Sequence, residues 1–115
     1  MADDIVLVSL RGPVRWAWRD EARASAAGQI DKATLQDGKR IVIRLTHAND
    51  AYSVDLQREF GDKFSGTWNR YLTGESNRAS VTLYQSLGNY FLFGEWFQDG
   101  EQFWWAELSV VPDEE

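Results

Sequence analysis

Several residue types are absent or scarce in this chain, and each absence excludes a kind of chemistry. The 115 residues contain no cysteine and a single histidine, His47. Without cysteine the chain can form neither a disulfide nor a catalytic thiolate. One histidine without cysteine also supplies too few of the ligands that transition metals prefer. We therefore expect no metal and no cofactor.

Catalytic signatures are missing as well. His47 falls in an expected turn over residues 46–50 with no nucleophile signature nearby, so we expect an exposed histidine and not a general base. The glycines mark turns or strand interruptions, and none belongs to a phosphate-binding loop. Because no acid, base and nucleophile converge, we expect a protein that is not an enzyme.

Long hydrophobic runs are also missing. The chain starts MADDIVLVSLRG, with acidic residues where a signal peptide carries bases. No segment approaches the roughly 20 apolar residues that a membrane-spanning helix needs. From these features we expect a cytoplasmic protein without membrane contact.

Basic residues stop at Arg78. Seven acidic residues and no lysine or arginine follow it, so the whole negative net charge of the chain, −6, arises in the C-terminal third. That distribution permits a cationic partner but does not suit a phosphate backbone, which needs lysine and arginine. Arginine also recurs at every fourth residue near the N-terminus, a spacing that would form a basic stripe on a helix. Because Gly12-Pro13 interrupts this segment, we do not expect one helix and we expect no nucleic-acid partner. These arginines are Arg11, Arg15, Arg19 and Arg23.

Aromatic side chains, in contrast, are abundant: the chain has six Trp, six Phe and four Tyr. Many of them lie in residues 80–111, which read SVTLYQSLGNYFLFGEWFQDGEQFWWAELSVV. Two tight-turn signals, Gly88-Asn89 and Asp99-Gly100, divide this segment into three apolar stretches. The pattern predicts a three-stranded antiparallel meander.

Two-residue turns would fix the register of this meander, with Gln98 opposite Glu101 and Leu87 opposite Tyr90. Alternation along each strand then sorts the side chains into two faces. The first face is strongly apolar and must be buried; it holds Val81, Leu83, Leu87, Tyr90, Leu92, Trp96, Phe103 and Trp105. The second is amphipathic; it holds Ser80, Thr82, Tyr84, Ser86, Phe91, Phe93, Glu95, Phe97, Gln102, Trp104, Ala106 and Leu108.

Aromatic rings on the second face stand beside hydroxyls and one carboxylate, which suits a ligand cavity or a partner surface. The candidate binding residues are Tyr84, Phe91, Phe93, Glu95, Phe97 and Trp104. Glu95 beside Trp104 could hold a cationic group. Alternatively, a second layer of the same domain covers this face. The register also places Glu95 and Glu107 on opposite faces, which excludes them as a hydrolytic carboxylate pair.

The remaining chain shows further strand patterns. Residues 5–11 and 14–19 suit strands separated by Gly12-Pro13. A hairpin is expected around Asp37-Gly38, and a three-residue loop with Gly38 left-handed would bring the apolar residues together; these are Ala33, Leu35, Ile41, Ile43 and Leu45. Residues 51–60 suit a strand or a helix, and we choose the strand. Residues 20–28 could form one short helical turn or continue a strand.

These elements predict an all-β protein, an antiparallel meander of about eight or nine strands that forms a barrel or a two-layer sandwich. We expect one domain over residues 1–115, with residues 1–4 and 112–115 frayed.

One motif resembles a known group of proteins. The run FSGTWNRY contains Gly66-Thr67-Trp68 and is followed by hairpins carrying Trp96, Trp104 and Trp105. It resembles the calycin-type up-and-down barrels, the avidin-like and lipocalin-like families, which have a Gly-x-Trp near their first strand. The resemblance implies a barrel that binds small molecules in its mouth. Here the motif lies in mid-chain, and the resemblance covers only the second half of the chain.

Together these features predict a non-catalytic binding module. It would bind a small apolar or cationic ligand or a protein through the second meander face, or associate with itself as a homodimer. The alternative is a small acidic inhibitor or immunity-type protein that presents the acidic meander to a basic partner.

Overall fold

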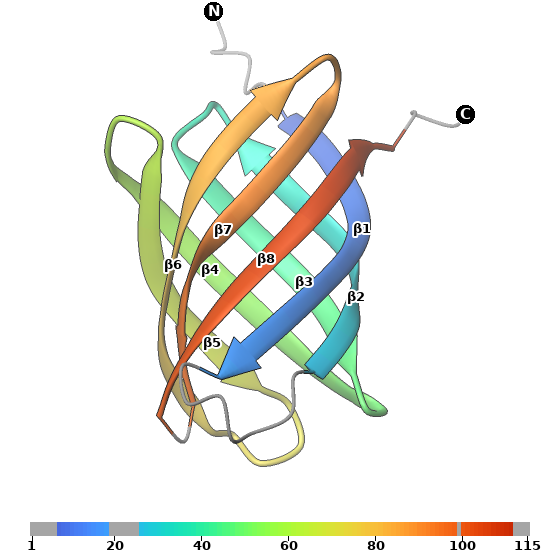
Figure 1. Ribbon diagram of the computed structural model, residues 1–115, viewed down its shortest axis with the longest axis vertical. Helices are drawn as coiled ribbons and strands as arrows, with labels where there is room; N and C mark the ends of the chain where they lie inside the picture. Colours follow the sequence, from blue (N-terminus) through green and yellow to red (C-terminus); the bar gives the residue numbers. More distant parts are fainter. Residues whose placement is uncertain (1–6, 19–25, 99, 112–115) are drawn as a thin grey trace, which may run out of the picture.

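The computed structural model describes residues 7–18, 26–98 and 100–111, and all regular secondary structure in these ranges is β-strand. Each strand pairs antiparallel with the next along the chain, and the first also pairs with the last, so the sheet closes into a barrel (Figure 1). The strands are β1 (Leu7–Trp18), β2 (Ala26–Gln36), β3 (Arg40–His47), β4 (Asp50–Phe60), β5 (Lys63–Arg70), β6 (Ser76–Ser86), β7 (Asn89–Phe97) and β8 (Glu101–Val110). The all-β prediction is confirmed, and of its two forms the barrel is the one observed.

The core fills the inside of the barrel. Successive side chains point to opposite faces of a strand, so every second residue faces inward. Small eight-stranded barrels are just wide enough for side chains to fill. The largest fully buried side chains come from seven strands and include three tryptophans. They are Trp68, Trp96, Trp104, Phe64, Ile30, Ile43, Leu45, Leu56, Leu92, Leu108, Val14 and Val54.

The expected hairpin around Asp37-Gly38 is confirmed. Gln36 pairs with Arg40, which leaves a three-residue loop, and Gly38 has a left-handed φ of 65°. All the apolar residues that this register was expected to collect pack into or against the core. Residues 51–60 are strand, as chosen, within β4. Gly12-Pro13 does not break the first strand; the pairing of β1 with β2 shifts between Leu10 and Gly12, and β1 runs on.

The predicted register between β6 and β7 is wrong by two residues. Ser86 pairs with Asn89, so Leu87 and Gly88 form the turn, both with positive φ. A shift of two leaves every side chain on its expected face, because the period of a strand is two. Leu87, which was expected in the core, is instead the fully exposed tip of this hairpin.

The predicted register between β7 and β8 is wrong by one residue, and the consequence is larger. Phe97 pairs with Glu101, so three residues and not two separate the strands. A slip of one residue exchanges the two faces of a strand. In β8, Trp104, Ala106 and Leu108 are therefore buried in the barrel, whereas Phe103 and Trp105, expected in the core, lie on its outside.

A glycine in β7 shows why the strands fit in this register. Gly94 lies opposite Trp104 and not Trp105. A Cβ added to Gly94 would stand 1.8 Å from the carbonyl oxygen of Ser80, and the indole Nε1 of Trp104 donates to that same oxygen over 3.0 Å. Because Gly94 has no side chain, strands β6 and β7 can approach each other closely at this point. The Trp104 ring packs beside it.

Some expectations fall outside the described residues. These are the possible helical turn over residues 20–25, which follows β1, and the fraying expected at residues 1–4 and 112–115. Residues 26–28, the end of the possible turn, belong to strand β2. In the described ranges, no helix of the length and apolarity needed to cross a membrane is found.

Candidate functional site

One end of the barrel contains a cavity of about 340 Å³, here called the mouth cavity. In an up-and-down barrel, odd-numbered strands end and even-numbered strands begin at the same end, so residues far apart in sequence meet there. Strands β1 to β5, β7 and β8 and the turn after β3 all contribute to the lining. Among the described residues, the lining is formed by Trp16, Trp18, Ala26, His47, Ala48, Tyr52, Arg70, Trp96, Gln98 and Gln102.

Aromatic rings form the floor and wall of the mouth cavity. The Trp96 ring meets that of Trp16 edge-on at 5.5 Å between centroids and that of Tyr52 at 6.0 Å. Beneath it, Trp68 stacks on Trp96 at 5.1 Å with only 8° between the planes. Offset and edge-to-face aromatic pairs are mutually attractive, and large rings are stiff. The apolar side of the cavity is therefore preformed.

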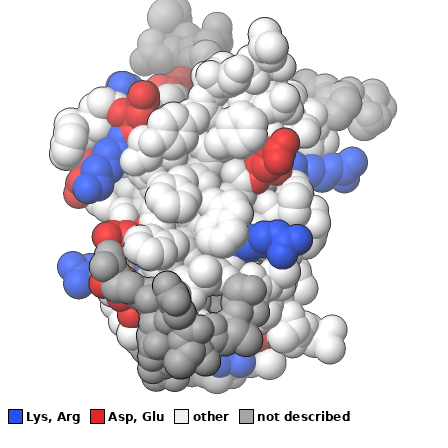
Figure 2. All heavy atoms as spheres, in the orientation of Figure 1, with Lys and Arg blue, Asp and Glu red and all other residues white. Residues whose placement is uncertain are grey.

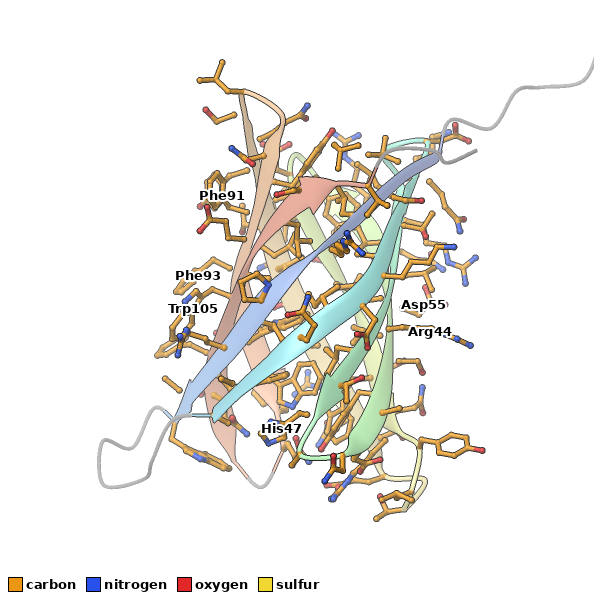
Figure 3. The ribbon with its side chains drawn as sticks, turned by 90° about the vertical axis from the view of Figure 1, so that its right-hand side faces the viewer. Arg44, His47, Asp55, Phe91, Phe93 and Trp105 are labelled. Carbon is orange, nitrogen blue, oxygen red and sulfur yellow. The ribbon has the colours of Figure 1, made fainter. Side chains whose placement is uncertain are left out.

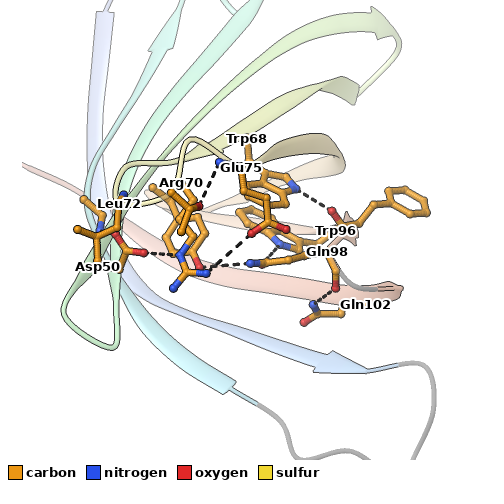
Figure 4. A network of polar contacts seen from close by, with 12 residues as sticks. Asp50, Trp68, Arg70, Leu72, Glu75, Trp96, Gln98 and Gln102 are labelled. Carbon is orange, nitrogen blue, oxygen red and sulfur yellow. Dashed lines mark hydrogen bonds and ion pairs between the residues drawn. The ribbon is translucent and has the colours of Figure 1, made fainter.

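Hydrogen bonds fix the polar side of the cavity (Figure 4). The Trp96 indole donates to Gln98 Oε1 over 2.9 Å, and Gln98 Nε2 lies 3.4 Å from the Tyr52 hydroxyl. Gln102, itself buried, donates through Nε2 to the Gln98 carbonyl over 3.1 Å. The carboxamides of Gln98, directly after β7, and of Gln102, at the start of β8, are thus held in place by partners inside the cavity wall.

One polar atom in the wall of the mouth cavity has no partner among the described residues. The indole Nε1 of Trp16 is buried and donates no hydrogen bond. A buried donor without an acceptor costs about 1–3 kcal/mol. The other buried tryptophans, Trp68, Trp96 and Trp104, each donate to an oxygen. Trp16 is therefore the exception that calls for an explanation at this site.

An ion pair braces the rim of the cavity. Arg70, at the end of β5, binds the buried carboxylate of Asp50 at the start of β4, and its Nη1 lies 3.8 Å from Glu75 Oε1 (Figure 4). The guanidinium of Arg70 also lies 5.9 Å from the centroid of the Tyr52 ring. The hydrogen bond from Arg70 lowers the pKa of Asp50, against the opposing effect of burial, and the backbone amides of Ala51 and Leu72 lower it further. Two carboxylates, those of Asp50 and Glu75, thus balance the charge of Arg70.

His47 corrects a sequence-based expectation. It is the last residue of β3 and half-buried, not an exposed turn residue. Its Nδ1 lies 2.8 Å from the carbonyl oxygen of Ala27, and its ring lies 5.4 Å from Trp16. A carbonyl can only accept, so Nδ1 carries the proton in this bond. The alternation Ile41, Ile43, Leu45 continues to position 47 and was a signal that this side chain faces inward.

Five of the six predicted binding residues lie on the outside of the barrel and not in a lumen. Tyr84 of β6 and Phe91, Phe93, Glu95 and Phe97 of β7 are all exposed or half-buried there. The sixth, Trp104, is separated from them: it is completely buried in the core. Trp105 replaces it on the outside, directly opposite Phe93. The prediction that Trp104 lies beside Glu95 was therefore wrong, because the pairing of β7 with β8 differs by one residue from the predicted register.

The same slip corrects the account of the carboxylates. Glu95 and Glu107 lie on the same face, not on opposite faces, since Glu95 pairs with Phe103 and Glu107 with Phe91. Four residues of β7 separate Glu95 from Phe91, so the two carboxylates are roughly 13 Å apart along the strand. Glycosidase pairs need about 5–9.5 Å. Within the described ranges, no group of three or more His, Asp or Glu side chains could hold a metal ion.

These features define a class: a closed, eight-stranded, antiparallel up-and-down barrel with an aromatic cavity at one end. The architecture is compatible with that of calycin-type barrels. Comparison with protein-family models, with curated proteins and with solved structures finds no match for this chain.

Proposed function

We propose that this protein is a non-catalytic binding module that takes a small ligand into the mouth cavity. The observation that carries the proposal is the preformed cavity itself, walled by Trp16, Tyr52 and Trp96 and edged by two fixed carboxamides. Small-molecule sites combine an apolar wall with a few fixed polar groups and have volumes of about 300–1,000 Å³. A calycin-like mode of binding, at the barrel mouth, is part of this proposal.

The lining indicates the chemistry of the ligand. Tryptophan and tyrosine faces favour flat apolar rings and cations. Arg70 is already bound by Asp50 and faces Glu75, so the described residues of the rim offer no unbalanced positive charge to an anion. We therefore infer a small planar ligand, apolar or cationic.

The alternative function, an acidic protein that docks its meander on a basic partner, has less support. Glu95, Glu101 and Glu107 point outward from β7 and β8. However, exposed arginines flank them, Arg15 on β1 and Arg78 on β6. A basic partner would meet these cations as well, and like charges at an interface oppose binding.

A cavity-filling substitution tests the ligand site. Ala26 lines the cavity, whereas its neighbour Ala27 is exposed on the outside of the same strand. Titrations of indole, benzylamine and benzoate, followed by tryptophan fluorescence, should show saturable binding of indole or benzylamine to the wild-type protein. In Ala26→Phe the added ring occupies the cavity, and the affinity should fall roughly tenfold or more, a change of about 1.4 kcal/mol.

Ala27→Phe is the matched control, because it adds the same ring outside the barrel and should bind as the wild type does. Equal binding by A26F and A27F would contradict the mouth site, as would a preference for benzoate. The absence of saturable binding of both uncharged and cationic rings would contradict the inferred ligand chemistry.

A further inference from the structure

The outside of strands β6 to β8 carries an aromatic cluster that the core does not use, here called the outer aromatic face. It is formed by Tyr84, Phe91, Phe93, Phe97, Phe103 and Trp105. Phe93 is 49% and Trp105 37% exposed, and the Phe93 ring lies 6.1 Å from that of Phe103 and 6.5 Å from that of Trp105. Figure 2 shows uncharged side chains gathered in the middle of this side of the molecule, with charged groups toward its margins.

The opposite side of the barrel gives the internal comparison. There most outward residues of β3 to β5 are polar or charged, with Val42, Ala51 and the exposed Phe60 at the end of β4 as exceptions. Figure 3 shows Arg44 and Asp55 on that side, away from Phe91, Phe93 and Trp105. Both sides belong to one closed barrel whose interior is already filled. Packing of the core therefore does not account for the aromatic residues, and clustered exposed aromatic residues mark an interaction site.

The closed sheet limits how a partner can bind here. Among the described strands, each has a hydrogen-bonded neighbour on both sides. A partner therefore cannot add a strand to an open edge, as it does in β-augmentation. It must pack its side chains against the outer aromatic face. Aromatic residues and arginine are the side chains enriched at the energetic centre of such interfaces.

The charges around the face indicate which partner fits. Three glutamates lie within it on β7 and β8, and three exposed arginines lie beside it on β1 and β6. They are Glu95, Glu101, Glu107, Arg11, Arg15 and Arg78. The charges of these six described residues thus cancel, although the chain carries −6. A strongly basic or acidic partner would meet like charges on it, whereas a surface with equal numbers of both signs can complement itself.

We propose that the outer aromatic face binds a second copy of this chain, forming a two-fold symmetric dimer. In such a contact the same patch is used by both copies, so it must be self-complementary. The rings of the two copies pack against each other, and the arginines beside the face of one copy meet the glutamates within the face of the other. The mouth cavity lies at the end of the barrel and not on this side, so ligand binding and dimer formation are separate properties.

Sedimentation and light scattering over a range of concentrations test the proposal. The wild-type protein should show a reversible monomer–dimer equilibrium. Phe93→Lys places a charge at the centre of the contact in both copies, and the dissociation constant should rise roughly 100-fold or more, as for central interface residues. Ser53→Lys is the matched control, because Ser53 is exposed on β4 beside Arg44, on the opposite side of the barrel, and this variant should dimerise as the wild type does. If Phe93→Lys does not fold, Trp105→Lys serves as a second variant at the centre of the contact.

Charge reversal distinguishes a second copy from another occupant. The double variant R11E/R15E makes the face acidic, and E95R/E107R makes it basic, so each alone should dimerise more weakly than the wild type. Mixed together, the two variants should form a heterodimer, because opposite charges again face each other.

Four results would overturn the proposal. They are a wild type that stays monomeric at roughly 100 µM, well above the micromolar range of specific interfaces; a dimer unaffected by F93K and W105K; an equal loss of dimer in S53K; or no heterodimer in the mixture. The A26F variant separates the two proposals, since it should lose ligand binding and keep the dimer.

Discussion

At the scale of single residues, the mouth cavity depends on side chains whose roles are not visible in a linear pattern. His47 and Gln102 stand in segments with no catalytic or binding motif, and both become cavity residues because their strands end at the same rim. The inward direction of His47 follows from the alternation in β3 and could have been predicted. The unpaired Trp16 indole could not, because its lack of an acceptor depends on packing between strands.

The Asp50–Arg70 pair makes a prediction at this scale. Because the folded protein lowers the pKa of Asp50, the carboxylate form stabilises the fold at neutral pH. That stabilisation is complete above the unfolded pKa of about 3.9 and is lost as the pH falls through the folded pKa. Asp50→Asn should therefore be less stable than the wild type at pH 7, and the difference should shrink below about pH 4. Urea denaturation at both pH values measures it.

Asp55→Asn is the control for this prediction. Arg40 binds Asp55 at 2.5 Å in a pair whose two side chains are 45% and 43% exposed. Arg40 also lowers the pKa of Asp55. Solvent screens this pair, however, and exposed ion pairs contribute about 0–1 kcal/mol to stability. A D50N variant no less stable than D55N at pH 7 would show that the rim pair does not brace the barrel.

At the scale of strands and turns, the elements were predictable but their exact pairing was not. Alternation of apolar residues identified β3, β4 and β6 to β8, and Gly38 identified a three-residue loop correctly. The same reasoning failed at the last hairpin, because a turn signal such as Asp99-Gly100 fits loops of two or three residues. One added loop residue then exchanged Trp104 and Trp105 between the core and the surface.

Those two neighbours provide the direct test of the register. Trp104 is completely buried, so Trp104→Ala should lower the free energy of unfolding by about 3–5 kcal/mol. Trp105 is partly exposed on the outside, so Trp105→Ala should cost less than about 1 kcal/mol in the monomer. Chemical denaturation at concentrations too low for dimers measures both. Effects of equal size, or in the reverse order, would contradict the pairing of Phe97 with Glu101.

At the scale of the whole molecule, closure of the sheet determines where function can lie. Alternation in the sequence indicated many antiparallel strands but allowed a barrel or a sandwich. The difference depends on the pairing of β1 with β8, between residues about 100 positions apart, for which no local pattern exists. Closure turns one meander face inward and the other outward, and it gathers seven strands around the mouth cavity.

The central claim is that this barrel binds its ligand at the mouth. The most direct measurement is a map of backbone amide NMR shifts during titration with indole or benzylamine, whichever binds with the higher affinity. We predict that the shifted amides cluster at the cavity residues, around Trp16, His47, Gln98 and Gln102. Shifts that cluster instead around Phe93 and Trp105, on the outside of the barrel, would contradict the claim.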